Sequence, residues 1–205
     1  MTRAGTDRRS LLIGGACLVA GATAARLAAA QGATDYAVFT ELSPEPKKMK
    51  DGWNRRIFTN TDVRKGSAIQ CDFANGIVTL APGAYHLAGY SMVAYFTGSE
   101  PPETTTTRSP ASAGYCRLRK VAAAEASDTL DMHAVDNGDP TVLCIGSPSS
   151  ANLVPSLFAT FYETDRPVAL VLEHQSGSKP EEIYLRVFVE NSKWHAFARL
   201  TIQRL

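Results

Sequence analysis

The chain has 205 residues, and its 21 Lys and Arg against 20 Asp and Glu give a formal net charge of +1. Binding to nucleic acid needs clustered positive charge, and no Lys/Arg stripe is present, so this charge balance excludes nucleic acid as a partner. The length suits one domain that buries a substantial core.

Residues 1–30 have the pattern of an export signal. Arg8 and Arg9 stand one residue before the apolar pair Leu11 and Leu12, and a Gly- and Ala-rich apolar run of about 15 residues follows. That run is shorter than the roughly 20 residues a spanning helix needs, so we expect no permanent membrane anchor. The segment resembles the twin-arginine signal family, which implies export of an already folded protein, cleavage after Ala30, and a periplasmic or secreted location. The alternative is a general secretory signal with a coincidental Arg pair.

The mature chain is predicted to begin with an extended arm. Cleavage would remove four basic and one acidic residues, so the net charge would fall from +1 to about −2. Residues 31–52 contain a Pro- and Lys-rich stretch that is poorly suited to a core, and we expect them to form an N-terminal arm or linker. The folded domain is predicted to span residues 53–205.

That domain has the pattern of a series of short strands. Runs rich in Val, Ile, Tyr, Phe and Thr alternate with turn signals such as Asn-Gly and Pro-Gly. Ile183, Leu185 and Val187 alternate with polar or aromatic neighbours, which is typical of a half-buried strand. With no βα alternation, the pattern predicts an all-β antiparallel sandwich of jelly-roll type with about ten strands. The predicted strands are 54–59, 68–73, 76–80, 84–96, 115–122, 130–135, 141–145, 156–163, 168–175, 183–189 and 194–202.

Several of these strands form a recognisable series. Residues 76–91 give a strand, a Pro-Gly turn, the Gly83-x-Tyr85 pattern and a long strand, and residues 156–162 and 168–174 give two further strands. This series resembles the C1q/TNF-like jelly rolls. The resemblance implies a sandwich, often trimeric, that recognises proteins or carbohydrates without catalysis. The long loop at residues 97–113 and the lack of a stalk depart from that pattern.

Three cysteines would survive signal removal, and their state is open. Cys116 and Cys144 lie in predicted strands, so a bridge between them is conceivable in an oxidising compartment. Buried reduced thiols, Cys71 included, are an equal alternative, because free Cys packs as a small hydrophobe.

The histidines offer one candidate metal set. No His-x-His pair of the cupin type is present, but Asp131 and His133 would share a strand face and His174 or Glu173 could supply a third ligand. Asp131, His133 and His174 therefore form the alternative of a divalent metal on a jelly-roll scaffold, against the simpler interpretation of ordinary strand residues. A calcium loop at residues 136–140 is a weaker candidate than a hairpin turn.

Tyrosines are the candidate binding residues. Tyr85, Tyr90 and Tyr95 recur along one predicted strand and could stack on a sugar or lie at a subunit interface, although a core role is the competing interpretation. We therefore predict an exported, non-catalytic binding or assembly module without a cofactor. Its partners would be a protein or carbohydrate ligand and further copies of itself, with a trimer as one option. The alternative is a metal-dependent enzyme on the same scaffold.

Overall fold

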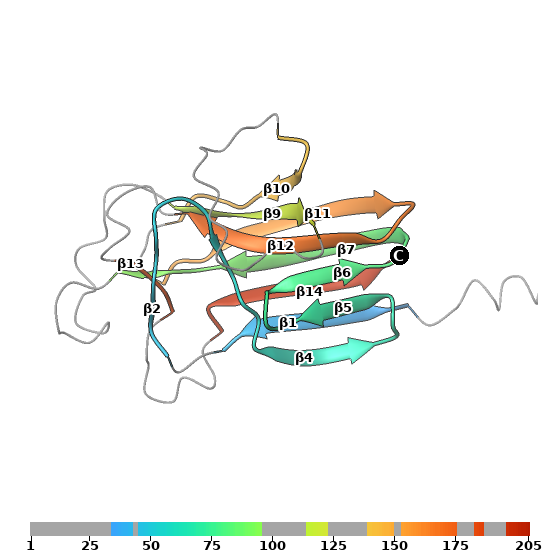
Figure 1. The fold of residues 1–205 in the computed structure, drawn as a ribbon, viewed down its shortest axis with the longest axis horizontal. Coiled ribbons are helices and arrows are strands. Elements are labelled where there is room, and N and C mark those ends of the chain that lie inside the picture. Colours follow the sequence, from blue (N-terminus) through green and yellow to red (C-terminus); the bar gives the residue numbers. More distant parts are fainter. Residues whose placement is uncertain are drawn as a thin grey trace, which may run out of the picture. The chain divides into compact units, whose positions relative to one another are not determined.

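The computed structural model describes residues 34–42, 45–95, 114–122, 139–149, 153–175, 183–186 and 196–205. The chain divides into two compact units, residues 1–34 and 35–205, and every described strand lies in the second. The described residues contain fourteen strands and no helix (Figure 1). The strands are β1 (Tyr36–Glu41), β2 (Lys47–Lys48), β3 (Asn54–Arg55), β4 (Asn60–Lys65), β5 (Ile69–Asp72), β6 (Ile77–Leu80), β7 (Gly83–Ser91), β8 (Ala94–Tyr95), β9 (Tyr115–Val121), β10 (Val142–Ile145), β11 (Ser156–Thr164), β12 (Val168–Gln175), β13 (Ile183–Arg186) and β14 (Ala198–Arg204).

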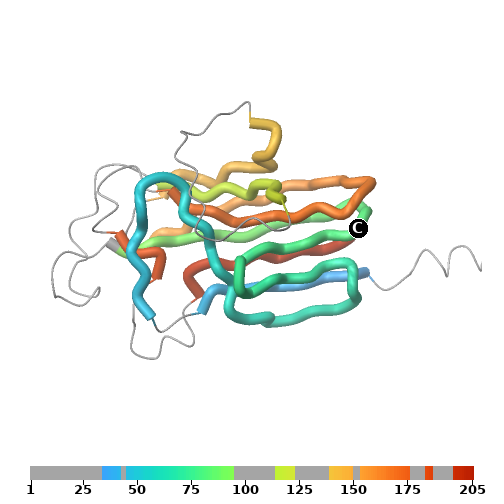
Figure 2. The backbone as a smooth tube through the Cα atoms, in the orientation of Figure 1, coloured from blue at the N-terminus to red at the C-terminus, as the bar shows by residue number. Residues whose placement is uncertain are grey.

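Two antiparallel sheets form the body of the second unit. The first, called the β14 sheet, has the order β11-β7-β14-β1-β4. The second, called the β12 sheet, has the order β10-β9-β12-β6-β5, and β3 also pairs with β12. A small third sheet, β2-β13-β8, lies at the left-hand end in Figure 1. In Figure 2 the segment between β1 and β4 arches over that end before it returns to the body.

The order of strand pairing identifies the jelly roll. Eight strands, taken along the chain as β1, β6, β7, β9, β10, β11, β12 and β14, pair the first with the last and continue inwards. Thus β1 pairs with β14, β6 with β12, β7 with β11, and β9 with β10. A long hairpin rolled into two sheets produces this nesting, so the predicted fold class is confirmed.

The core lies between the two sheets and follows the period-two alternation of the sequence. On β14, Ala198, Leu200 and Ile202 are buried while the residues between them are exposed or half-buried. Leu170 and Leu172 of β12 face them from the other sheet within one cluster of buried side chains. The pattern predicted for 183–189 also holds where it is described, because Ile183 and Leu185 are buried.

The sandwich begins earlier than the sequence indicated. Residues 31–52 were expected to be an arm, but β1 lies within them and pairs with both β14 and β4, with Ala37 and Phe39 in the core. The Pro- and Lys-rich composition of the segment belongs to the stretch after β1, not to β1 itself. Strand β4 was not predicted, because it is an edge strand with mostly exposed, charged residues.

Candidate functional site: the outer face of the β14 sheet

The outer face of the β14 sheet carries small and apolar side chains across its middle. Its central row runs across all five strands, since Ala159 pairs with Ala88, Ala88 with Thr201, Thr201 with Val38 and Val38 with Val63. Neighbouring residues on a strand point to opposite sides, so these five share the face turned away from the core. Val63, at the β4 edge, is 43% exposed.

Two larger apolar side chains stand at the opposite edge, on β11. Leu157 is 56% exposed and Phe161 is 73% exposed. The Phe161 ring packs against His86 of the neighbouring strand β7, with ring centroids 5.0 Å apart. We call these two residues, together with the central row, the apolar face. Covering these side chains would be favourable, because the transfer of apolar area out of water contributes about 25 cal/mol per Å².

One end of the apolar face is closed by polar contacts. Arg199 forms an ion pair with Asp62 at 3.0 Å, and the Thr40 hydroxyl donates to the other Asp62 oxygen at 2.9 Å. The Tyr90 hydroxyl donates to the Ala196 carbonyl at 3.1 Å. These polar groups, at the margin of the apolar face, therefore have their hydrogen-bond partners within the chain.

The predicted tyrosines fall into different environments. Tyr85 lies fully buried between the sheets, and its hydroxyl donates to the Ala81 carbonyl at 2.8 Å. Burial raises its pKa. Tyr90 lies on the outer face between Leu157 and Arg199, beside the apolar face. The backbone of Tyr95 pairs with Ile183 in the small sheet, and its side chain lies outside the described part.

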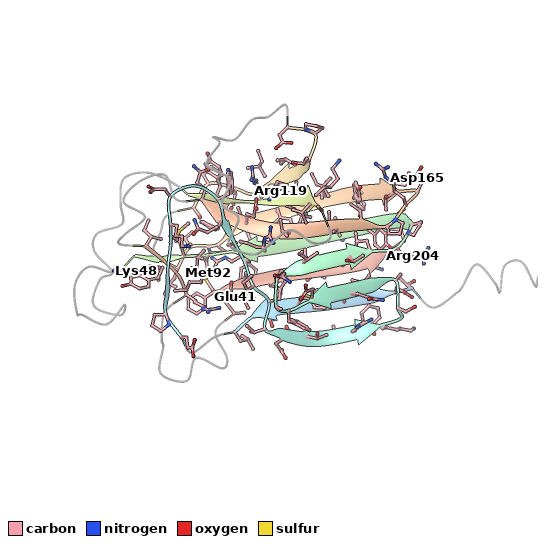
Figure 3. All side chains as sticks on the ribbon, in the orientation of Figure 1. Glu41, Lys48, Met92, Arg119, Asp165 and Arg204 are labelled. Atoms are coloured by element: carbon pink, nitrogen blue, oxygen red, sulfur yellow. The ribbon has the colours of Figure 1, made fainter. Side chains whose placement is uncertain are left out.

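His174 lies in a buried polar chain that links the sheets. Arg56 Nε donates to Ser91 Oγ at 2.8 Å, and Ser91 Oγ lies 2.8 Å from His174 Nδ1. Arg56 also pairs with Glu41 at 3.2 Å, and Arg186 pairs with the other Glu41 oxygen at 3.2 Å. Arg56 also donates to the Met92 carbonyl. Figure 3 labels Glu41 and Met92 in the left half of the view.

This polar chain determines the charge state of His174. Burial, together with the positive charge of Arg56, holds the His174 pKa well below its ordinary value. The Ser91 hydroxyl has two acceptor lone pairs and one proton, so it can accept from Arg56 and still form a hydrogen bond with Nδ1 in either neutral tautomer of the ring. The Nε2 atom has no hydrogen-bond partner in the described part of the chain.

The proposed metal set stays a prediction. Asp131 and His133, and the loop at 136–138, lie outside the described residues. Glu173, the alternative third ligand, is buried and accepts from Arg117 at 2.7 Å and Arg119 at 2.8 Å. Among the described residues no group of three or more His, Cys, Asp and Glu side chains is placed to hold a metal ion.

The three cysteines in the described part of the chain, Cys71, Cys116 and Cys144, are free thiols. Cys144 pairs with Leu118, two residues along β9 from Cys116. Such diagonal neighbours have Cα atoms roughly 7–8 Å apart, beyond the usual span of a disulfide. Burial raises the pKa of Cys71 to about 12 and that of Cys144 to about 11, so both thiols are poor nucleophiles near neutral pH.

Sequence reasoning missed the apolar face and the buried ion pairs. A signal for the face exists in β11, where Leu157 and Phe161 alternate with Phe158 and Tyr162, so that both sides of the strand are apolar. The pairing of Glu41 with Arg56 has no such signal, because it depends on a turn of the chain between the two residues.

Comparisons with known proteins give a likeness in fold. No family model matches the chain, and no curated protein matches it. The chain is similar to crystal structures of murine APRIL at pH 8.0, 5.0 and 8.5, with 10%, 8% and 9% sequence identity and TM-scores of 0.49, 0.47 and 0.46. Each match covers 84% of this chain and 99% of the other. The jelly-roll assignment rests on the strand pairing described above.

Proposed function

We propose that this protein is an exported, non-catalytic binding or assembly module that associates with further copies of itself through the apolar face. The exposed Phe161 and Leu157 at the β11 edge, next to a row of small side chains, are the observation that carries the proposal. Exposed apolar patches of this kind are typical of interaction sites.

The face has two patches of different shape, which we propose fit together between copies. The β11 edge presents two large side chains, whereas the central row towards β4 presents Ala88, Thr201 and Val38, which leave room above the sheet. An edge of one copy that packs on the face of the next forms a contact between two different patches. Repeated contacts of that type form closed rings or open filaments, and we propose a closed ring of three copies from the sequence resemblance.

Export and the ligand complete the proposal. Arg8 and Arg9 support a twin-arginine route to the periplasm or the exterior, and residues 1–30 lie outside the described part. Within the described ranges no helix has the length and apolar character to cross a membrane. A ligand of protein or carbohydrate class remains part of the proposal. The metal-dependent alternative has less support, because Arg56 places a positive charge beside His174.

The test is the mass of the purified protein in solution, measured by size-exclusion chromatography with light scattering. We expect a discrete oligomer, which Phe161→Asp converts to monomer. Ile145→Asp is the matched control, since it places the same charge on an exposed residue of the edge strand β10 in the other sheet. A monomeric parent protein, or equal dissociation by both variants, would contradict the proposal. Circular dichroism would show that each variant is folded.

A further inference from the structure

Strand β11 is a long edge strand of the β14 sheet. It has nine residues with one charged side chain among them, and all nine pair with β7 without a register shift. The other edges of the two sheets are less open to pairing. Strands β5 and β10 have four residues each, and β4 carries Asp62, Arg64 and Lys65 and has a register shift against β1. Short strands, charges and irregular pairing protect sheet edges from further strands, and β11 has little of this protection.

The backbone of β11 turns alternate residues away from β7. Leu157 N donates to Ser147 Oγ at 3.0 Å, and Leu157 O accepts from Ser147 N at 2.8 Å, so the backbone groups of this residue point away from β7. In an antiparallel ladder, residues two apart direct their backbone groups to the same side. Ala159, Phe161 and Glu163 therefore direct their N–H and C=O groups out of the free edge.

These outward groups are available for further hydrogen bonds. In the described part of the chain, the N–H groups of Ala159, Phe161 and Glu163 have no hydrogen-bond partner. The Phe161 carbonyl accepts from the Thr160 hydroxyl at 3.3 Å, and a carbonyl oxygen has a second lone pair. A row of donors and acceptors on every second residue is the complement of another extended strand.

The side chains along this edge define which strand would fit. On the outer face Phe161 is 73% exposed, and Ala159 beside it is small and exposed. On the inner face Thr160 and Tyr162 are half-buried, and Tyr162 packs against the core cluster. Glu163 is exposed and has no ion pair within the described ranges. An apolar residue next to Phe161 and a cation next to Glu163 would therefore complement the edge.

We propose that the free edge of β11 binds an extended segment of a partner protein as an additional strand. Backbone hydrogen bonds to Ala159, Phe161 and Glu163 would supply affinity, and the alternate side chains of the segment would supply specificity. The segment has an apolar residue next to Phe161 and Lys or Arg next to Glu163. This proposal names the protein ligand of the binding function proposed above and rests on that function, but it does not depend on self-association.

The experiment is a titration of the isotope-labelled protein with a synthetic peptide, Lys-Thr-Val-Lys-Val-Thr-Lys with blocked ends, followed by NMR of the protein's backbone amides. We expect the amides of residues 159, 161 and 163 to move downfield and to exchange more slowly with solvent when the peptide is bound. The control peptide has the same sequence with every amide N-methylated, so it has no backbone donors and should not bind. Both titrations are repeated on Phe161→Asp, because the proposed self-association would cover the edge in the parent protein.

Variants make the assignment specific. Ala159→Pro removes one outward N–H at an edge position, where proline is tolerated, and should weaken binding by at least about threefold. Ala159→Ser keeps the N–H and is the matched control. Glu163→Gln should weaken binding by about twofold, because one ion pair is lost. Amide dispersion reports the folding of each variant.

Three results would overturn the proposal. The first is that the peptide shifts none of the three amides in either the parent protein or Phe161→Asp. The second is that the N-methylated peptide binds as well as the unmodified one. The third is that Ala159→Pro binds as tightly as Ala159→Ser. Light scattering reports the oligomer separately, so a monomeric parent protein that binds the peptide would contradict self-association and leave the strand addition supported.

Discussion

Replacing Arg56 by methionine is expected to destabilise the domain more than most single substitutions. The Arg56 side chain is fully buried and donates to Ser91 Oγ at 2.8 Å, to Glu41 at 3.2 Å and to the Leu185 carbonyl at 2.5 Å. Met replaces the aliphatic part of the Arg56 side chain but can donate none of these bonds. Glu41 would then stay buried, at 1% exposure, with Arg186 as its remaining described partner.

The magnitude follows from the charge left behind. Removing one partner of a buried ion pair costs about 3–5 kcal/mol of stability. The lower end of that range applies here, because Arg186 still pairs with Glu41. We therefore expect a loss of about 3 kcal/mol in the free energy of unfolding. For a domain of this size that corresponds to a fall in Tm of roughly 10 °C.

The assay is unfolding in urea, followed by circular dichroism. The midpoint should fall with the slope unchanged, because the surface exposed on unfolding is the same. The double variant Arg56→Met, Glu41→Gln removes both charges and should recover part of the loss, since no uncompensated carboxylate remains. A loss below about 1 kcal/mol for Arg56→Met, or a double variant less stable than Arg56→Met alone, would refute the reasoning.

Three further predictions rest on single sites. Gly89→Ala should cost about 1–3 kcal/mol in unfolding, because a Cβ there would overlap the Arg199 carbonyl oxygen; a Tm equal to that of the parent protein would contradict this. Because the native His174 pKa is lowered, the unfolded state binds a proton below about pH 6.5 and the native state does not. The free energy of unfolding should therefore fall by up to about 1.4 kcal/mol per pH unit, until the pH reaches the lowered pKa. His174→Gln should flatten this part of the stability–pH curve, and an unchanged slope would disprove the assignment. Cys71 and Cys144 should react slowly with a thiol reagent at pH 8 in the native protein and rapidly in urea, and fast native labelling at these positions would show that their thiols are accessible.

Most of the strands could be predicted from the sequence, because strand alternation is a local property. Leu200 and Ile202, two residues apart, are enough to assign one buried face to β14, whatever pairs with it. The turn chemistry of Asn75-Gly76 likewise marks the end of one strand and the start of another, with Gly76 at a φ of 65°. Strand β4 has no buried alternation and was therefore missed.

The candidate sites depend on contacts that no local pattern records. The odd spacing of Tyr85 and Tyr90 along β7 places them on opposite faces of the strand, but only the packing of the two sheets decides that the face of Tyr85 is the core side. The order of pairing decides what lies beside each of them. Cys116 and Cys144 similarly lie on paired strands, but the register places Cys144 opposite Leu118.

Local sequence was enough to establish the all-β class, most of the strands and the alternation that builds the core, since each arises within a few residues. The packing of distant segments was needed to show that β1 belongs to the sandwich, that Arg56 meets Glu41 in the interior, and that Leu157 and Phe161 remain outside. These features depend on which parts of the chain lie side by side. The free energy that selects them comes from burial and pairing over the whole domain, so no single stretch of the chain contains it.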